Sequence, residues 1–238
     1  MATNHTCIDF TDSAGRDFKI IKTKASNIKL VGFNPPEKIR DTIYYGMNAS
    51  FYDTVSTNKD VQNIAYQDGS PVESISGGTT NLVGKSIVSW NGTTLAHNTN
   101  VTLGSSSSVP KTSGSWAQGG VALFLCDTSW RAKYEAQFSE EEQYEDLDGV
   151  SARTGLLINT NTKDVYMVAT RILSSLVTDL RRAMMEYAGL TEGGSSGYWR
   201  GMMLDGGRST QLLGEDINLY VPVLSREVPQ IISLKNKN

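Results

Sequence analysis

Short apolar runs separated by turn-forming residues dominate the hydrophobic pattern of this chain. Two of them, Gly119–Asp127 and Trp199–Leu204, are rich in consecutive apolar residues, which is typical of strands buried on both faces. Residues 17–22 and 28–33 also carry apolar side chains in short runs, and the turn-like residues 24–27 lie between them. This spacing predicts that the two runs pair as adjacent strands.

A hairpin is predicted where residues 155–159 and 165–170 flank a Lys-Asp turn. Apolar residues then recur at three- and four-residue spacing over 172–188, and a glycine follows, which predicts an amphipathic helix. A Glu-rich stretch indicates a short second helix near 135–146. Further short strands are expected over residues 42–47, 210–213, 217–223 and 228–234. These elements predict an α+β fold, with mostly antiparallel or mixed strands and one main helix.

Composition narrows the class of protein. The chain has 238 residues, 39% of them hydrophobic, and no Gly/Pro-rich linker divides it, so we expect a single domain over residues 1–238. The formal charge is −3 and no Lys/Arg block is present, which argues against nucleic-acid binding. The chain has no run of about eighteen apolar residues and begins with no signal-peptide pattern. We therefore expect no membrane insertion, and a cytoplasmic or virion-associated location unless the chain was trimmed.

Neither a cofactor nor a metal centre is predicted. The only two cysteines and the only two histidines lie far apart in the sequence, which argues against a disulfide framework, a thiolate zinc site and a His-rich metal centre. Asp53, Asp205 and Asp216 could donate oxygen ligands to a divalent cation, but their spacing matches no calcium-binding loop.

The stretch MMLDGGRSTQ gathers groups suited to hold a phosphate or a sugar. An apolar run stops there at a carboxylate, and the next residues add backbone donors, a guanidinium and two hydroxyls. The candidate residues are Asp205, Gly206, Gly207, Arg208, Ser209 and Thr210. The alternative is a plain hairpin, because Asp-Gly between apolar runs is a strong turn signal.

Two other segments carry candidate site residues. In NASFYD, Asn48 offers a donor and an acceptor, Phe51 and Tyr52 could stack on a sugar face, and Asp53 is a second carboxylate. The alternative is an Asx-type turn with its aromatic residues in the core. Arg153 and Arg171 flank the predicted 155–170 hairpin on the same side, which would suit a phosphate. Such arginines also commonly meet solvent or a structural carboxylate.

Four separated segments occur in a characteristic order: Tyr45–Asp53, Arg153–Gly155, Leu204–Thr210 and Arg226–Pro229. This order resembles the phosphodiester glycosidase (NAGPA-like) domain family. That family shows a Gly-x-Asn-Gly-Gly-Phe-Phe segment, an Arg-Thr strand, an amphipathic helix leading to an Asp-Gly-Gly-Gly-Ser strand end, and an Arg-x-Val-Pro close. The resemblance spans residues 28–234, nearly the whole chain.

The resemblance implies hydrolysis of the bond between a sugar's anomeric carbon and a phosphodiester, as in N-acetylglucosamine-1-phosphodiesters. A phosphate leaving group is already a stable anion, so guanidiniums that stabilise its charge matter more than a proton donor. Arg153 and Arg226 would hold the phosphate, helped by the candidate residues 206–210. Asp205 would support the oxocarbenium-like sugar or activate water, Asn48 would orient hydroxyls, and Asp53 would be the second carboxylate.

The chain departs from the family pattern at three positions. Ala49 and Ser50 stand where the family has two glycines, and Arg208 replaces a third. Two other functions therefore stay open. One is a non-catalytic module that binds a glycan or a sugar phosphate on a cell wall or a virion. The other is an intracellular hydrolase of a nucleotide-like phosphodiester, with aromatic residues such as Phe51 or Trp199 stacked on the base.

Overall fold

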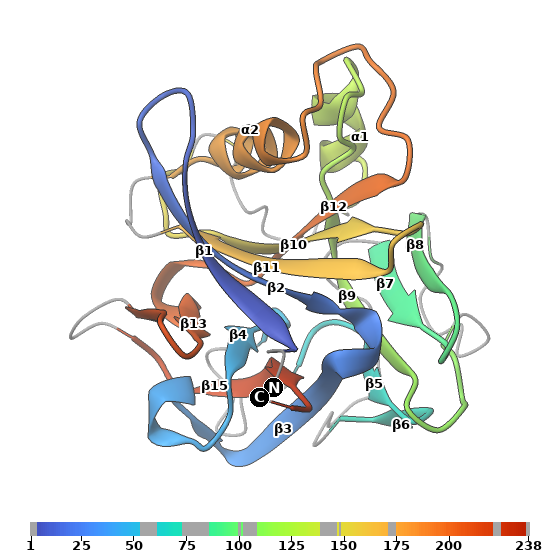
Figure 1. Cartoon of the computed structure of the whole chain (residues 1–238), viewed down its shortest axis with the longest axis vertical. Helices are drawn as coiled ribbons and strands as arrows, with labels where there is room; N and C mark the ends of the chain where they lie inside the picture. Colours follow the sequence, from blue (N-terminus) through green and yellow to red (C-terminus); the bar gives the residue numbers. More distant parts are fainter. Residues whose placement is uncertain are drawn as a thin grey trace.

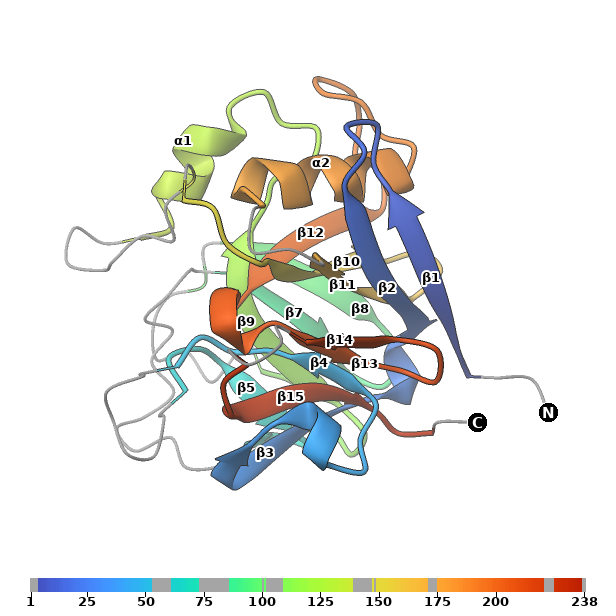
Figure 2. The same cartoon turned by 90° about the vertical axis from the view of Figure 1, so that its left-hand side faces the viewer.

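The chain folds into three layers, two of which are antiparallel β-sheets (Figure 1). The computed structural model describes residues 4–52, 61–72, 86–99, 101, 109–138, 147, 149–170, 175–220 and 225–236. Within these residues, helices α1 (Trp130–Glu135) and α2 (Val177–Tyr187) cover one face of a 10-stranded sheet. A 5-stranded sheet covers the other face of the larger sheet (Figure 2).

The larger sheet has the order β1-β2-β11-β10-β12-β9-β5-β6, and β7 pairs with both β8 and β9. Its strands are β1 (His5–Thr11), β2 (Asp17–Lys24), β5 (Ala65–Gln67), β6 (Ser70–Pro71), β7 (Ser86–Trp90), β8 (Leu95–Thr99), β9 (Trp116–Ala122), β10 (Thr154–Asn159), β11 (Asp164–Thr170) and β12 (Trp199–Leu204). The smaller sheet has the order β14-β13-β4-β15-β3. Its strands are β3 (Ile28–Glu37), β4 (Gly46–Asn48), β13 (Gln211–Leu213), β14 (Asn218–Tyr220) and β15 (Val228–Leu234).

The expected α+β class is wrong. The protein is a mostly antiparallel β-structure with 46% strand and 14% helix. The physical reason is that a second sheet, and not a further set of helices, covers the inner face of the larger sheet. The periodic pattern over 172–188 also contributes less helix than expected, because α2 begins only at Val177. Before it, Ser175 forms an isolated β-bridge with Ser151, and residues 171–174 lie outside the described part of the chain.

Alternating side chains on the central strands explain why these strands are apolar throughout. Leu156 on β10 and Leu204 on β12 pack between the two sheets, in the core that also holds Ile232 of β15. Leu157 and Met203, their neighbours in sequence, point the other way and pack in the core beneath α2. Both faces of the sheet are therefore buried, which confirms the predicted doubly buried strand over residues 201–204, whereas Trp199 and Arg200 are half-buried. The other strand predicted to be buried on both faces, at residues 119–127, is β9 and ends already at Ala122.

Other predictions are partly confirmed. The 155–170 hairpin is present as β10 and β11. The strands at 17–24 and 28–37 exist but do not pair, because β2 joins β1 and β11 in the larger sheet, whereas β3 joins β15 in the smaller one. A short second helix was expected near 135–146. Helix α1 instead lies before this stretch and ends at Glu135, residues 136–138 are not helical, and residues 139–146 lie outside the described part.

The two cysteines occupy different layers of the fold. Cys7 packs at the core between the sheets, and Cys126 packs in the core beneath the helices, so both are free thiols. In the described part of the chain, no helix is long and apolar enough to span a membrane.

Candidate functional site

The C-terminal end of β12 is where the two sheets are joined. Residues 205–210 carry the chain from β12 in the larger sheet to β13 in the smaller one, so the Asp-Gly-Gly segment is not a hairpin turn. The Asn48 side chain of β4 links the two sides of this crossing. Its amide nitrogen donates to the backbone oxygen of Asp205 at 2.6 Å, and its amide oxygen accepts from the backbone nitrogen of Gln211 at 3.0 Å.

Two further contacts fix the backbone at Asp205. The Thr154 hydroxyl of β10 donates to the same Asp205 backbone oxygen, and the Asp205 nitrogen donates to the oxygen of Ala49 at 3.1 Å. Asn48 and Thr154 are each almost completely buried, whereas Asp205 is half-buried. Hydrogen bonds from buried residues therefore fix the backbone at the end of β12, while Asp205 itself remains partly open to solvent.

The two glycines after Asp205 are required by close packing and by backbone conformation. A Cβ atom on Gly206 would lie 2.5 Å from the backbone oxygen of Ala152, which is closer than real Cβ contacts allow. Gly207 has φ of +61°, in the left-handed region that favours glycine, and its nitrogen donates to the same Ala152 oxygen at 2.7 Å. The segment 205–207 is thereby pressed against the strand that begins at Thr154.

A tyrosine hydroxyl lies beside Asp205. The Tyr52 hydroxyl is 3.0 Å from the Ser209 hydroxyl and donates to the backbone oxygen of Glu227 at 3.3 Å. Burial raises the pKa of Tyr52 above its usual value and the charge of Asp205 raises it further, while Ser209 and the Arg226 guanidinium lower it. Tyr52 therefore keeps its proton at neutral pH, and a carboxylate and a guanidinium both lie near its hydroxyl.

Arg226 is tied to the crossing segment through its backbone. Its nitrogen donates to the oxygen of Arg208 at 2.9 Å, and its oxygen accepts from the side-chain nitrogen of Gln211 at 2.8 Å. Both arginines are exposed. Two exposed guanidiniums are consequently carried on adjacent backbone segments, where they can meet an anion.

Arg153 is placed differently from the other arginines. It is only 2% exposed, and its Nε donates to the oxygen of Ser175 at 3.3 Å while its Nη2 donates to the oxygen of Gly149. It directly precedes Thr154, so its backbone belongs to the site. Its side chain joins the segment before β10 to the segment before α2, and so it helps to hold both segments in place.

A buried polar network lies behind the site. The Ser50 hydroxyl donates to Gln230 Oε1 at 2.8 Å and accepts from Gln118 Nε2 at 2.9 Å, and Gln230 Nε2 donates to Gln118 Oε1 at 3.1 Å. All three residues are at most 3% exposed. Ser50, which stands where the resemblance has a glycine, thus joins β9 of the larger sheet to β15 of the smaller one.

The sequence matches no family model and none of the curated proteins. Solved structures do resemble the chain. A hypothetical protein from Synechocystis is 11% identical with a TM-score of 0.53, and the match covers 96% of this chain and 61% of that chain. A protein from Burkholderia pseudomallei is 13% identical with a TM-score of 0.38, covering 98% of this chain and 58% of that chain. The first likeness shows a shared fold alone.

Most of the predicted site residues lie around the crossing segment, and four need separate comment. The Phe51 side chain is buried in the core beneath the helices, as the alternative of a core aromatic expected. Thr210 is fully buried, and its hydroxyl has no hydrogen-bond partner among the described atoms. Asp53 and Arg171 lie outside the described residues. Within the described part, no group of three or more His, Cys, Asp or Glu residues is arranged to hold a metal ion.

Sequence reasoning missed several residues of this region. Tyr52 was expected only as a possible stacking group, yet its hydroxyl is the group beside Asp205. Gln118 and Gln230 are isolated amides within the apolar strands WAQGGVA and VPQIISL. An amide inside a buried strand requires a polar partner, so this pattern is the signal that could have revealed the network.

Proposed function

We propose that this protein is a hydrolase that cleaves the bond between the anomeric carbon of a sugar and a phosphodiester, with Asp205 at the centre of the site. One observation carries the proposal. The four segments of the resemblance, which are separated by up to about 180 residues, are hydrogen-bonded to one another around Asp205. Together these segments bring a carboxylate and guanidinium groups into one region, which suits binding of a sugar joined to a phosphate.

Arg226 and Arg208 supply the positive charge in this proposal. A guanidinium meets two phosphate oxygens through parallel hydrogen bonds, and both arginines are exposed on segments joined by the Arg226 nitrogen. The buried Arg153 contributes by holding the strand that carries Thr154 in place. In this proposal the phosphate binds to the exposed arginines, and the sugar binds beside Asp205.

The chemical step needs a water molecule and no redox partner. The water oxygen bonds to the anomeric carbon while the bond from that carbon to the phosphate oxygen breaks. The electron pair leaves with the phosphate as a phosphomonoester, and Asp205 accepts the proton of the water. The Tyr52 hydroxyl keeps its proton and donates a hydrogen bond to the backbone oxygen of Glu227, which helps to position the segment that carries Arg226. Free sugar and phosphomonoester are the two products.

The test is a substrate panel offered to the intact protein. It contains the methyl phosphodiester of N-acetylglucosamine-1-phosphate, a nucleotide sugar and a cyclic nucleotide, and the products are separated by chromatography. We expect free N-acetylglucosamine and methyl phosphate from the first compound only. Saturable binding without products would contradict hydrolysis and favour a binding module. Turnover of the nucleotide sugar or the cyclic nucleotide alone would instead favour the nucleotide hydrolase.

Replacing one guanidinium separates a specific phosphate contact from a general effect of charge. Arg226→Gln should lower kcat/KM about 100-fold, because it removes a charged donor from the leaving group. Arg131→Gln is the matched control, since Arg131 is exposed on α1 and touches none of the four segments. Equal losses in the two variants would refute the assigned role of Arg226.

A further inference from the structure

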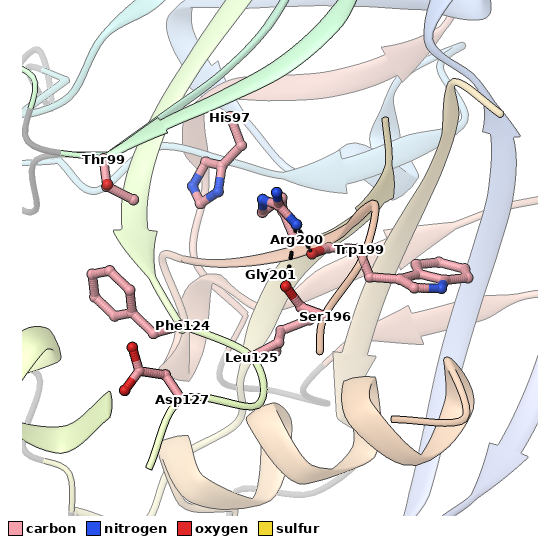
Figure 3. A pocket seen from close by; sticks show the side chains of 9 residues that line it. All are labelled: His97, Thr99, Phe124, Leu125, Asp127, Ser196, Trp199, Arg200 and Gly201. Atoms are coloured by element: carbon pink, nitrogen blue, oxygen red, sulfur yellow. Dashed lines mark hydrogen bonds between the residues drawn. The ribbon is translucent and has the colours of Figure 1, made fainter. Parts of the chain in front are cut away.

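A cavity lies at the opposite end of β12 from Asp205. Its volume is about 260 Å³, and His97, Phe124, Asp127 and Arg200 are among the residues that line it (Figure 3). It opens between the start of β12, the end of β8 and the loop that follows β9. The cavity shares no residue with the crossing segment 205–210, so it is a separate site.

Arg200 brings a guanidinium into this cavity. Its Nη1 donates to the backbone oxygens of Gly197 at 2.8 Å and Trp199 at 2.7 Å, and these bonds fix the guanidinium in place. In the described part of the chain, its Nε and Nη2 have no partner, and no carboxylate lies within ion-pair distance of it. The guanidinium is half-buried and already oriented, which is the arrangement that favours binding of an anion.

A neutral histidine stands beside the guanidinium. His97 points toward Arg200 across the cavity (Figure 3), and its Nε2 is 2.6 Å from the hydroxyl of the buried Ser86. Burial, with a smaller contribution from the charge of Arg200, lowers the pKa of His97 to about 4. At neutral pH the cavity therefore offers one positive charge, together with an uncharged imidazole ring.

The opposite wall is apolar and held in a strained conformation. Phe124 and Cys126 have φ of +44° and +67°, values that residues with a side chain rarely adopt. Arg181 on α2 supports this loop, because its Nη2 donates to the oxygen of Phe124 at 3.1 Å. The carboxylate of Asp127 also lines the cavity, but it forms an ion pair with Lys133. The loop thus holds the Phe124 ring in the cavity wall.

We propose that this cavity binds a small organic monocarboxylate, with its carboxylate on Arg200 and a flat apolar body against Phe124 and Leu125. A single guanidinium and a neutral imidazole match one negative charge. A phosphate dianion fits less well, because the cavity offers a single guanidinium for its two charges. The volume is sufficient for a ligand with one ring.

The test is a titration of the full chain with sodium benzoate, followed by NMR of the histidine ring signals. The chain has only two histidines, so His97→Gln assigns the two sets of signals. We expect a saturable shift of the His97 signals while those of His5 stay unmoved. Benzamide, the uncharged analogue, should bind about tenfold more weakly because it loses the charge-assisted hydrogen bonds. Phenyl phosphate should also bind more weakly than benzoate.

Two variants and a control complete the experiment. Arg200→Gln should weaken benzoate binding about tenfold. Thr99→Trp should weaken it through bulk alone, because Thr99 is exposed, lines the cavity and lies outside the Gly197–Trp199 turn that Arg200 stabilises. Arg40→Gln should leave it unchanged, because Arg40 is exposed in the turn at residues 39–41 and does not line the cavity. Equal binding of benzoate and benzamide, tighter binding of phenyl phosphate, or wild-type affinity in both cavity variants would overturn the proposal.

Discussion

The side-chain amide of Asn48 donates a hydrogen bond to the backbone carbonyl of Asp205 at 2.6 Å, although 157 residues separate the two in sequence. This bond joins the smaller sheet to the larger one at the point where the chain crosses between them. Because the other end of the Asn48 amide holds the nitrogen of Gln211, one side chain fixes both ends of the crossing segment. The geometry of the candidate site therefore depends on how the two sheets pack.

Removing this amide should destabilise the whole fold. Asn48→Ala leaves the buried nitrogen of Gln211 without its acceptor, so we expect the free energy of unfolding to fall by about 1–3 kcal/mol. Denaturant titration monitored by circular dichroism measures the change. Asn98→Ala is the control, because Asn98 is exposed on β8. A loss no larger than in the control would show that the amide does not hold the sheets together.

Adding a single methyl group to the crossing segment should affect activity more than stability. In Gly206→Ala the new Cβ must move away from the Ala152 oxygen, which displaces Asp205, and we expect kcat/KM to fall about 100-fold. Gly15→Ala tests the effect of backbone strain elsewhere, because Gly15 has φ of +78° but no atom within 4 Å of the Cβ position. Gly15→Ala should keep its activity, and an equal loss in both variants would contradict the role of the Gly206 contact.

The buried network of Ser50, Gln118 and Gln230 should behave as one unit. Gln230→Leu leaves the backbone nitrogen of Ser50 and the Oε1 of Gln118 unpaired, so we expect a loss of about 1–3 kcal/mol. The double variant Gln118→Leu/Gln230→Leu should cost less than the sum of the two single variants. A double-mutant cycle of unfolding free energies measures the difference, and strict additivity would argue against a coupled network.

Acid should destabilise the protein through His97. Its pKa of about 4 in the folded state lies below the unfolded value of about 6.5, so between these pH values only the unfolded state binds the proton. The contribution of His97 to the free energy of unfolding is then fully present above pH 6.5. As the pH drops toward 4, the free energy of unfolding falls by up to about 3 kcal/mol. Denaturation series at stepped pH should show a shallower acid loss in His97→Gln. Identical pH profiles of the wild type and His97→Gln would show that His97 does not cause the loss of stability in acid.

The central strands were predictable from sequence, because their apolar runs are short and continuous, as is typical of strands buried on both faces. Trp199–Leu204 is the clearest case. Strand pairing was less accessible, because the local turn at residues 24–27 suggested that the strands at 17–24 and 28–37 are neighbours. The structure instead places them in different sheets. The order of strands depends on contacts between residues far apart in sequence, such as Ile21 with Met167.

In the candidate site, too, residues marked by a local sequence pattern were predictable, and residues that depend on distant contacts were not. Asp205 and its glycines were recognisable because an apolar strand stops at a charged, flexible segment. The roles of Tyr52 and Thr154 were not, since neither side chain has a local partner that marks it. Phe51 and Tyr52 are neighbours, yet one side chain enters the core beneath the helices and the other reaches Ser209. Only the packing of the two sheets decides which of them faces the site.

The most direct test of the central claim is the rate of N-acetylglucosamine release from its methyl phosphodiester by wild-type protein and by Asp205→Asn. The substitution keeps the size of the side chain and the backbone carbonyl that Asn48 and Thr154 hold, so the variant should fold normally by circular dichroism. We predict measurable turnover by the wild type and a loss of about 1,000-fold in the variant. Equal rates in two correctly folded proteins would contradict the assignment of Asp205 to the reaction.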